Sequence, residues 1–250
     1  MSDESEQLAA ESQRIIDAAE TAGARLRLTG SVAVHLRCPR HGPFARRDRQ
    51  LGDIDMAAYK RDAGVIRRLF AELGYAEDKE VFIVSEGARA IFEQPGTRLH
   101  IDVFFDRLDF CHTIALAGRL ETDPRTLPLA ELLLSKLQIV QINEKDLLDA
   151  IVLLLEHPLS ESDDAINLPR IVELLSGDWG LWRTAGINLG KTRQTAEAHE
   201  RLGAAERAQV ATRIEALLRR VEDAPKPLAW RMRAKVGDRV KWYRDVDEVR

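Results

Sequence analysis

Acidic residues stand inside two stretches that alternate like buried β-strands, and this placement constrains the fold more than any other feature of the chain. Asp53 and Asp55 lie in the run 51–59, and Asp102 lies in the apolar run 99–105. Alternate side chains of a strand share a face, so Asp53 and Asp55 are predicted to point the same way. A buried carboxylate is costly unless a cation offsets its charge. We therefore expect a compensating cation where the two strands meet.

A divalent metal carrying the phosphates of a nucleotide is the simplest such cation. If the two strands are neighbours, three carboxylates converge, and their hard oxygens suit magnesium. Two such ions about 4 Å apart stabilise both the attacking and the leaving oxygen of an in-line phosphoryl displacement. For Asp53 and Asp55 taken alone, a carboxylate pair at a strand end or turn is the more ordinary interpretation. The ordered combination with Asp102 favours the metal site.

A Gly-Ser pair precedes these carboxylates. Residues 25–29 are predicted to form a short strand, and residues 32–36 the first turns of a helix. Gly30 at the junction lets the backbone approach a ligand closely, and Ser31 can cap the helix. Exposed amides at a helix start bind phosphate, although a Gly-Ser before a helix is often only a cap.

The three motifs in this order resemble the nucleotidyltransferase superfamily of DNA polymerase β, in particular its bacterial branch of abortive-infection toxins and antibiotic nucleotidyltransferases. The likeness is carried by residues 28–31, 49–56 and 100–104 and spans about residues 25–150. It implies a mixed sheet flanked by helices and a Gly-Ser loop that grips the phosphates of an NTP. It also implies two magnesium ions held by Asp53, Asp55 and Asp102, with Asp102 orienting or deprotonating the acceptor hydroxyl.

The chain departs from the family pattern between the first two motifs. The gap from Ser31 to Asp53 is longer than is usual by about one loop. The extra stretch, residues 37–49, is rich in Pro, Gly and Arg and is predicted to be a loop insertion. Arg49 at its end is a candidate partner for the nucleotide's phosphates.

Composition predicts a cytoplasmic enzyme with no membrane segment. Two cysteines in 250 residues give no disulfide framework, and neither a long apolar run nor a signal segment is present. The pairs Cys38/His41 and Cys111/His112 are poor zinc ligands, because adjacent strand residues point to opposite faces. We interpret Cys38 as a loop cysteine and Cys111 as a buried one.

Periodicity predicts helices and strands followed by an all-helical domain, an α/β (α+β) fold. The resemblance implies that the first part is a nucleotidyltransferase-type mixed sheet flanked by helices. The catalytic domain is expected over residues 1–124, and the helical domain with a basic tail over 125–250. The catalytic domain is expected to contain both helices and strands. Gly74 is expected to cap the C-terminus of the helix that precedes it. Helices are predicted over 5–22 and 63–73, and strands over 81–84, 88–92 and 98–105.

A lysine interrupts the apolar arc of the helix predicted over 128–141. Lys136 must extend its charge to water or meet an anion. It is either a phosphate contact on the nucleotide, as the family often has on its first C-terminal helix, or the structural partner of Asp146 or Asp149. Lys145, Asp146 and Asp149 resemble a Lys-Asp-x-x-Asp stretch of the toxin branch. A Lys145–Asp149 pair within the helix predicted over 145–156, or ion pairing between helices, explains that stretch equally well.

Charge is distributed unevenly and bears on the acceptor. The net charge is −4, yet residues 37–49 hold five Arg against one Asp, and residues 226–244 hold seven Lys or Arg against one Asp. The second stretch contains aromatic residues that either stack on bases or anchor the tail to the core: Trp230, Trp242 and Tyr243. A basic rim suits a polyanion such as tRNA, whereas a polycationic antibiotic would suit an acidic rim.

The expected activity is that of a metal-dependent nucleotidyltransferase, which moves an NMP from an NTP to an acceptor hydroxyl and releases pyrophosphate. Asp53, Asp55 and Asp102 form the expected catalytic and metal site, and the expected nucleotide contacts are Gly30, Ser31, Arg49 and Lys136. The toxin branch suggests tRNA as acceptor and an antitoxin as partner. The alternatives are an antibiotic or small-molecule nucleotidyltransferase and a non-catalytic nucleotide-binding module.

Overall fold

The structure is a computed structural model that describes residues 3–46, 52–97 and 99–245. The chain divides into two compact units. The first unit comprises residues 1–108 and 115–128, and the second comprises residues 109–114 and 129–250. Each unit is described by itself below.

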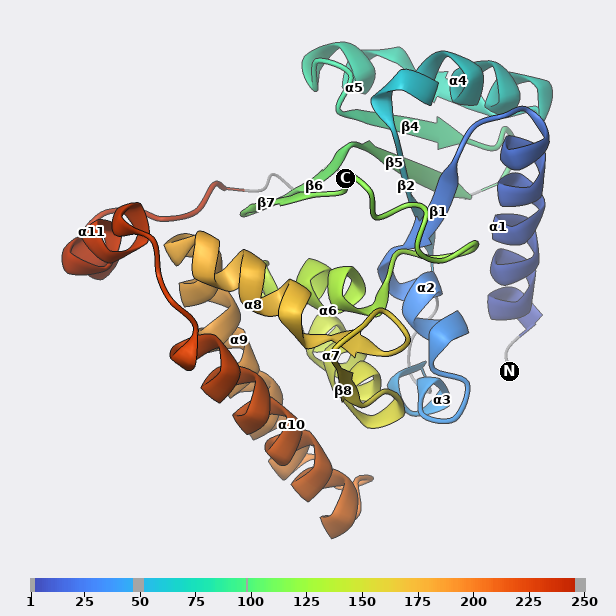
Figure 1. Ribbon diagram of the computed structural model, residues 1–250. Helices are drawn as coiled ribbons and strands as arrows, with labels where there is room; N and C mark the ends of the chain where they lie inside the picture. Colours follow the sequence, from blue (N-terminus) through green and yellow to red (C-terminus); the bar gives the residue numbers. More distant parts are fainter. Residues whose placement is uncertain (1–2, 47–51, 98, 246–250) are drawn as a thin grey trace. The chain divides into compact units, whose positions relative to one another are not determined.

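A five-stranded mixed sheet in the order β1-β2-β5-β4-β3 organises the first unit (Figure 1). Strands β2 and β5 run parallel, and the other neighbouring pairs are antiparallel. The mixed sheet expected from the resemblance is therefore confirmed. Its strands are β1 (Leu26–Thr29), β2 (Asp53–Ala58), β3 (Ala76–Asp78), β4 (Arg89–Glu93) and β5 (His100–Phe105).

The two faces of this sheet differ in chemistry. On one face, Phe92 of β4 stacks on Phe70 of α4, with ring centroids 4.0 Å apart. Ile101 and Ile54 are fully buried and follow Phe92 across the same face in register. The alternate residues, including Asp55 and Asp102, point to the opposite face. The apolar core and the carboxylates thus lie on opposite sides of one sheet.

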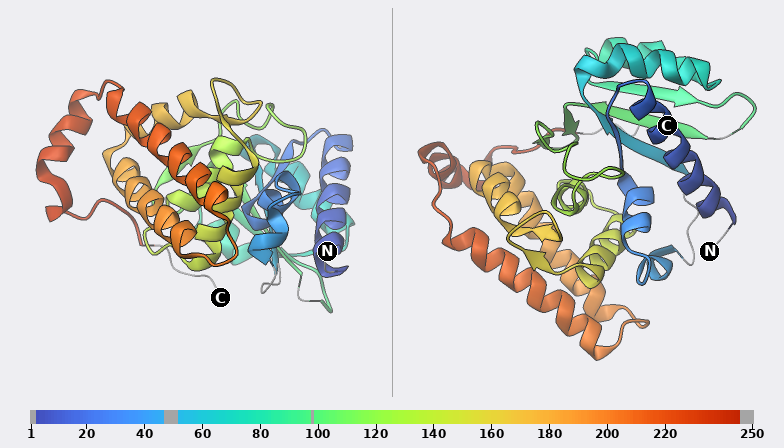
Figure 2. Two further views of the ribbon diagram at one scale, coloured as in Figure 1. Left: turned by 90° about the horizontal axis from the view of Figure 1, so that it is seen from below. Right: turned by 45° about the vertical axis from the view of Figure 1, so that its right-hand side comes forward.

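Helices of the first unit pack along these strands, as the views in Figure 2 show: α1 and α2 contact β1, α4 contacts β3, and α5 contacts β4. Helix α4 ends at Glu72. Gly74 lies two residues further along the chain and has a φ of +87°. These elements are α1 (Asp3–Thr21), α2 (Gly30–Arg37), α3 (Gly42–Arg46), η1 (Lys60–Asp62), α4 (Ala63–Glu72) and α5 (Lys79–Val84).

The strand predicted over 81–84 is wrong, because these residues form most of α5. The side chain of Asp78 accepts hydrogen bonds from the backbone N–H groups of Glu80 and Val81. This cap begins a helix and overrides the strand preference of the β-branched residues that follow. Ile83 and Val84 are consequently exposed on α5 instead of buried in the sheet.

The predicted loop insertion over 37–49 is also partly helical. It begins with the last residue of α2 and contains α3, while residues 47–49 lie outside the described part of the chain. Cys38 lies in the connection between α2 and α3, as expected of a loop cysteine, and it is fully buried. Cys111 is buried as expected, and both are free thiols.

Helices dominate the second unit, but its description as all-helical is too strict, because β8 (Leu159–Ser160) and β9 (Ile166–Asn167) pair in parallel. Short strands β6 (Arg107–Asp109) and β7 (Thr113–Ala115) form a separate pair. No helix among the described residues is both long and apolar enough to cross a bilayer. The helices are α6 (Leu129–Leu137), α7 (Glu144–Glu156), α8 (Leu168–Gly177), α9 (Trp179–Ala198), α10 (Ala204–Asp223) and α11 (Leu228–Val236), with η2 (Gly237–Arg239) after them.

Helix α6 ends four residues before the predicted limit at residue 141. Asn188 on α9 explains this end, because its side-chain amide donates to the carbonyl oxygens of Leu137 and Ile139 at 2.9 and 2.7 Å. Carbonyl groups at a helix end have no partner within the helix. A side chain distant in sequence therefore satisfies them.

Candidate functional site

Two carboxylates face each other across the parallel strands at the centre of the sheet. Asp55 of β2 is the register partner of Asp102 of β5, and Asp53 is the partner of His100. The strands are thus neighbours, as convergence of the three carboxylates required. All four side chains lie on the same face.

The three carboxylates differ in burial. Asp102 is 5 % exposed, Asp55 is half-buried and Asp53 is exposed. The expectation that all three are buried in strands is therefore wrong for Asp53, which begins β2 where the strand reaches the solvent. The charge-burial argument applies in full to Asp102 alone.

Arg89 neutralises that buried carboxylate. Its Nε lies 2.9 Å from both carboxylate oxygens of Asp102, and a terminal nitrogen also donates to Oδ2. Burial raises the pKa of Asp102 above its usual value, and the guanidinium beside it opposes that shift. The compensating cation of Asp102 is thus a side chain of this protein.

Sequence reasoning missed Arg89. It stands at the first position of β4, in register with Phe104 and two residues from Ile91, the partner of Asp102. The only signal in the sequence is a basic residue at the start of a predicted apolar strand. The antiparallel pairing that places it beside Asp102 is a tertiary feature.

Gly30 lies against the carboxylate of Asp55. It has a φ of +65°, and a Cβ at this position would lie 1.9 Å from Oδ2 of Asp55. Any other residue would displace that carboxylate. Gly30 was predicted to let the backbone approach a ligand closely. In the structure, the close approach is to the carboxylate of Asp55.

The turn before α2 differs from its predicted form. Thr29, in an extended conformation, occupies the N-cap position without a side-chain cap bond, so Ser31 lies inside the helix and is not its cap. Thr29 is the register partner of Asp55. Its buried hydroxyl oxygen has no hydrogen-bond partner among the described residues. A polar atom and the first amides of α2 thus lie beside one carboxylate.

The acidic side chains on this face of the sheet are the oxygen donors that a magnesium ion would require. Within the described chain, no group of three or more His, Cys, Asp or Glu side chains is arranged to hold a metal ion. Asp102 is engaged by Arg89, whereas Asp53 and Asp55 are more accessible carboxylates of the kind that magnesium prefers. The chemistry of the donors fits the ion, with Asp53 and Asp55 as the residues to hold it.

Lys136 belongs to the second unit and makes the structural contacts considered for it. Its Nζ lies 2.9 Å from Oδ1 of Asp146 and 2.9 Å from Oδ2 of Asp149, both on α7. Asp149 and Asp146 raise the pKa of Lys136 in spite of its burial. Lys145 is exposed, and Asp149 bonds to Lys136 in place of the predicted Lys145 pair. Arg49 lies outside the described residues.

The aromatic residues of the basic tail anchor it to the second unit. The indole N–H of Trp242 donates to the hydroxyl of Thr184 at 3.0 Å, and that of Trp230 donates to the carbonyl of Leu175 at 3.3 Å. The Trp230 ring also packs edge-on against Trp182 at 5.1 Å. Of the two roles considered, anchoring is the one these contacts fulfil.

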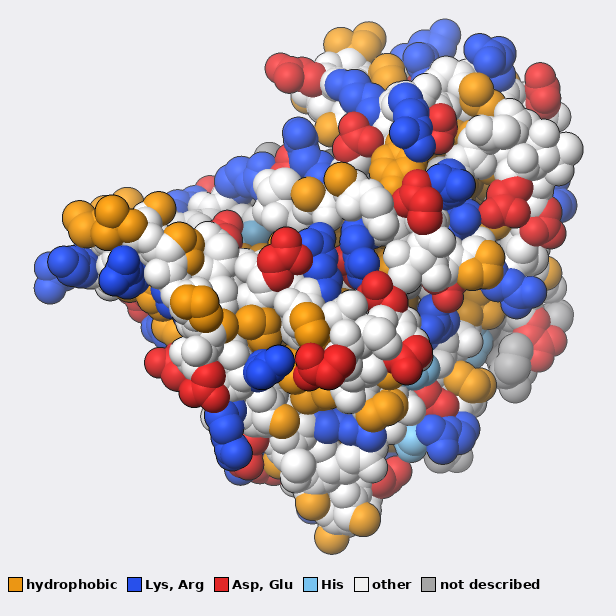
Figure 3. Space-filling model, viewed as in Figure 1, with side chains coloured by type: hydrophobic (Ala, Val, Ile, Leu, Met, Phe, Trp, Pro, Cys, Tyr) orange, Lys and Arg blue, Asp and Glu red, His pale blue; other side chains and the backbone are white. Residues whose placement is uncertain are grey.

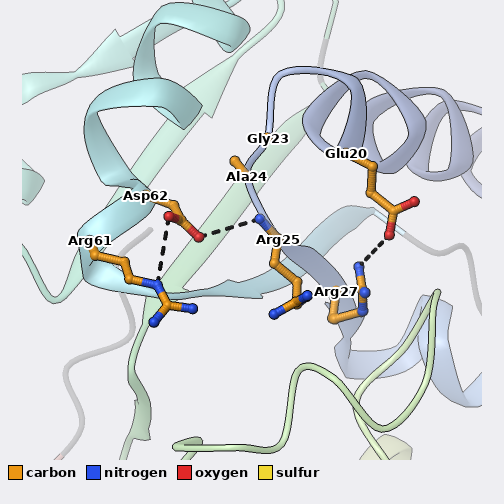
Figure 4. Close-up of a pocket in the computed structure, with 7 residues that line it drawn as sticks. All are labelled: Glu20, Gly23, Ala24, Arg25, Arg27, Arg61 and Asp62. Carbon is orange, nitrogen blue, oxygen red and sulfur yellow. Dashed lines mark hydrogen bonds and ion pairs between the residues drawn. The ribbon is translucent and has the colours of Figure 1, made fainter.

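A separate pocket of about 440 Å³ opens at the other end of β1 from Gly30 (Figure 4). Two ion pairs lie within it: Arg27 with Glu20 at 3.1 Å and Arg61 with Asp62 at 3.9 Å. The lining holds three Arg and two acidic residues, so most of its charge is compensated. Its lining residues are Glu20, Gly23, Ala24, Arg25, Arg27, Arg61 and Asp62.

Comparison with known proteins does not assign the chain to a family. No protein-family model, no curated protein and no solved structure matches the chain.

Proposed function

We propose that the protein is a metal-dependent nucleotidyltransferase, which transfers an NMP from an NTP to an acceptor hydroxyl with release of pyrophosphate. One observation carries the proposal. Asp55 faces Asp102 across parallel strands while the Gly30 turn abuts its carboxylate. The placement agrees with what the likeness of these motifs to the DNA polymerase β superfamily implies.

Each part of this arrangement has a role in the proposal. Asp53 and Asp55 would hold magnesium, which neutralises phosphate charge when it is bound. Gly30 and Ser31 begin α2, at the positive end of the helix, and their amides would take the phosphates. The Thr29 hydroxyl supplies a further polar group beside them.

Asp102 would orient the acceptor hydroxyl and take its proton. Burial favours the protonated form of this carboxylate, and Arg89 favours the ionised form that can accept a proton. Arg89 is therefore a positioning residue, which holds both oxygens of Asp102 and favours the ionised form of the group.

The same ion pair favours a second candidate, a nucleotide-binding module without turnover. A guanidinium that takes both oxygens of Asp102 does for this carboxylate what a metal would otherwise do. Such a module would bind an NTP but release no pyrophosphate.

For the acceptor, we retain tRNA as the proposal and a small molecule such as an antibiotic as its alternative. The basic stretches support a polyanionic acceptor. Trp230 and Trp242 no longer add to that support, because their indoles bond within the second unit. An antitoxin partner likewise remains a proposal that rests on the family likeness.

The test is to incubate the full chain with magnesium, total tRNA and each labelled NTP in turn, and to follow both pyrophosphate and label. The proposal predicts transfer by the native chain and loss with Asp55→Asn. Asp223→Asn is a matched control, since Asp223 is an exposed carboxylate at the end of α10. Pyrophosphate without labelled RNA would assign a non-RNA acceptor. NTP binding without pyrophosphate would favour the module.

A further inference from the structure

Apolar side chains form an exposed stripe along α11. Leu228, Met232 and Val236 are 65, 54 and 39 % exposed, and Val240 after the helix is 57 % exposed. The spacing of four residues places the three helical members on one face. Large aliphatic side chains aligned in this way mark an interaction surface more than isolated exposed leucines do.

Cations run beside this stripe at the same spacing. Arg231, Lys235 and Arg239 are exposed, and their side chains make no ion pair within the described part of the chain. No acidic residue occurs between residues 224 and 237, although Asp and Glu make up 41 of the 250 residues. Figure 3 shows the hydrophobic side chains gathered over α11 with basic side chains next to them.

The helix is held in place from its inner side. Trp230 packs on Trp182 and donates to the Leu175 carbonyl, and Arg233 stacks over Trp179 at 4.4 Å. The guanidinium of Arg233 also donates to backbone carbonyls after the helix. The stripe is thus presented by a helix that is already folded, so binding does not have to order its backbone.

The chemistry of this surface narrows its occupant. A second α11 would bring like charges together, because the helix has no carboxylate to pair with them. A nucleic acid would use the cations but would leave the aliphatic side chains against phosphate and sugar. A surface that combines negative charge with an apolar interior would pair with the cations and also bury the aliphatic side chains.

We propose that α11 docks on the surface of an anionic lipid bilayer. Leu228, Met232 and Val236 enter the boundary between headgroups and acyl chains, and Arg231, Lys235 and Arg239 remain at the headgroups. Short amphipathic helices with basic polar faces bind bilayers in this interfacial manner. The helix lies in the plane of the surface and does not cross it. This proposal does not require the proposed transferase activity, but it assigns to lipid the cations of residues 226–244, so that support for a tRNA acceptor then rests on residues 37–49.

The experiment is co-sedimentation of the full chain with vesicles of phosphatidylcholine alone and of phosphatidylcholine mixed with phosphatidylglycerol. We expect binding to the mixed vesicles, little binding to neutral ones, and weakening by salt. Leu228→Ser/Met232→Ser and Arg231→Gln/Lys235→Gln should each reduce binding at least about tenfold, since both terms contribute. The matched controls are Leu218→Ser and Arg219→Gln, at exposed positions of α10. Circular dichroism would verify that each variant is folded.

Three results with vesicles, and one with RNA, would overturn the proposal. The first is absence of binding to the mixed vesicles, which would leave the stripe to a protein partner. The second is binding that survives Leu228→Ser/Met232→Ser, which would assign the association to charge alone. The third is equal loss of binding with the α10 controls, which would show that α11 is not the docking surface. Tighter binding to RNA that depends only on Arg231, Lys235 and Arg239 would point to a nucleic acid instead.

Discussion

Arg89 on β4 holds both carboxylate oxygens of Asp102 on the neighbouring strand β5, with Nε 2.9 Å from each. Asp102 in turn faces Asp55 across the parallel pair β2–β5. One basic side chain therefore lies within the row of acidic groups that defines the candidate site. The ion pair lets Asp102 be buried before any ligand is present.

The ion pair predicts how activity depends on pH. In Arg89→Met, burial of Asp102 is no longer opposed, so its pKa rises further. Since the proposed role requires the ionised carboxylate, the acid limb of the rate profile should move to higher pH. The rate above that limb should be affected less. A profile of kcat against pH tests this prediction, and an unmoved acid limb would exclude Asp102 as the titrating group.

Stability should depend on pH in the opposite sense from that of an ordinary surface carboxylate. Because burial raises the pKa of Asp102 on folding, the folded chain holds this proton more tightly than the unfolded chain. The resulting stabilisation is complete below the unfolded pKa and is lost as pH rises through the raised folded value. Urea unfolding from about pH 3 upward should show this loss in the native chain. A slope unchanged by Asp102→Asn would contradict the assignment.

Gly30→Ala should disrupt the candidate site. The new methyl group would lie 1.9 Å from Oδ2 of Asp55, and the positive φ costs a further 1–2 kcal/mol or so. Gly74→Ala is a matched control, since Gly74 also has a positive φ but no atom within 4 Å of an added Cβ. Thermal melts of both variants and their NTP affinities separate strain from collision. Equal NTP binding by both would show that the Gly30–Asp55 approach is not needed.

Lys136→Met should destabilise the second unit. It leaves Asp149 buried and Asp146 partly buried without their cation, a change that typically costs about 3–5 kcal/mol. Much of that loss should be recovered in Lys136→Met/Asp146→Asn/Asp149→Asn. Lys145→Met is a control, because Lys145 is exposed. This substitution should leave the free energy of unfolding nearly unchanged. The free energy of unfolding of the three variants tests this prediction. If Lys136→Met leaves it unchanged, the ion pairs contribute nothing to stability.

Magnesium and an NTP together should raise the melting temperature of the native chain. A ligand at about 100 times its Kd stabilises the folded state by about 2.7 kcal/mol. Asp53→Asn/Asp55→Asn should abolish the magnesium-dependent part of the shift, and EDTA should do the same to the native chain. If neither the double substitution nor EDTA changes the shift in melting temperature, the nucleotide binds away from these carboxylates.

Local pattern in the sequence accounts for much of the first unit. Alternation around Ile54 and Ile101 identified β2 and β5, and the spacing of apolar residues before Gly74 identified α4. These predictions succeeded because one face of each element is buried against a single core. The strand predicted over 81–84 failed because Asp78 caps a helix there, which makes the apolar residues α5.

The sequence by itself determined which residues lie on one face of β2, that Gly30 lies at the junction of a strand and a helix, and that acidic and apolar positions alternate around Asp102. These properties follow from backbone geometry within a few residues. Only the tertiary structure decided that Arg89 neutralises Asp102, that Gly30 abuts Asp55, and that Lys136 meets Asp146 and Asp149. Such contacts depend on strand order and helix packing, because they join residues whose separation along the chain carries no periodic signal.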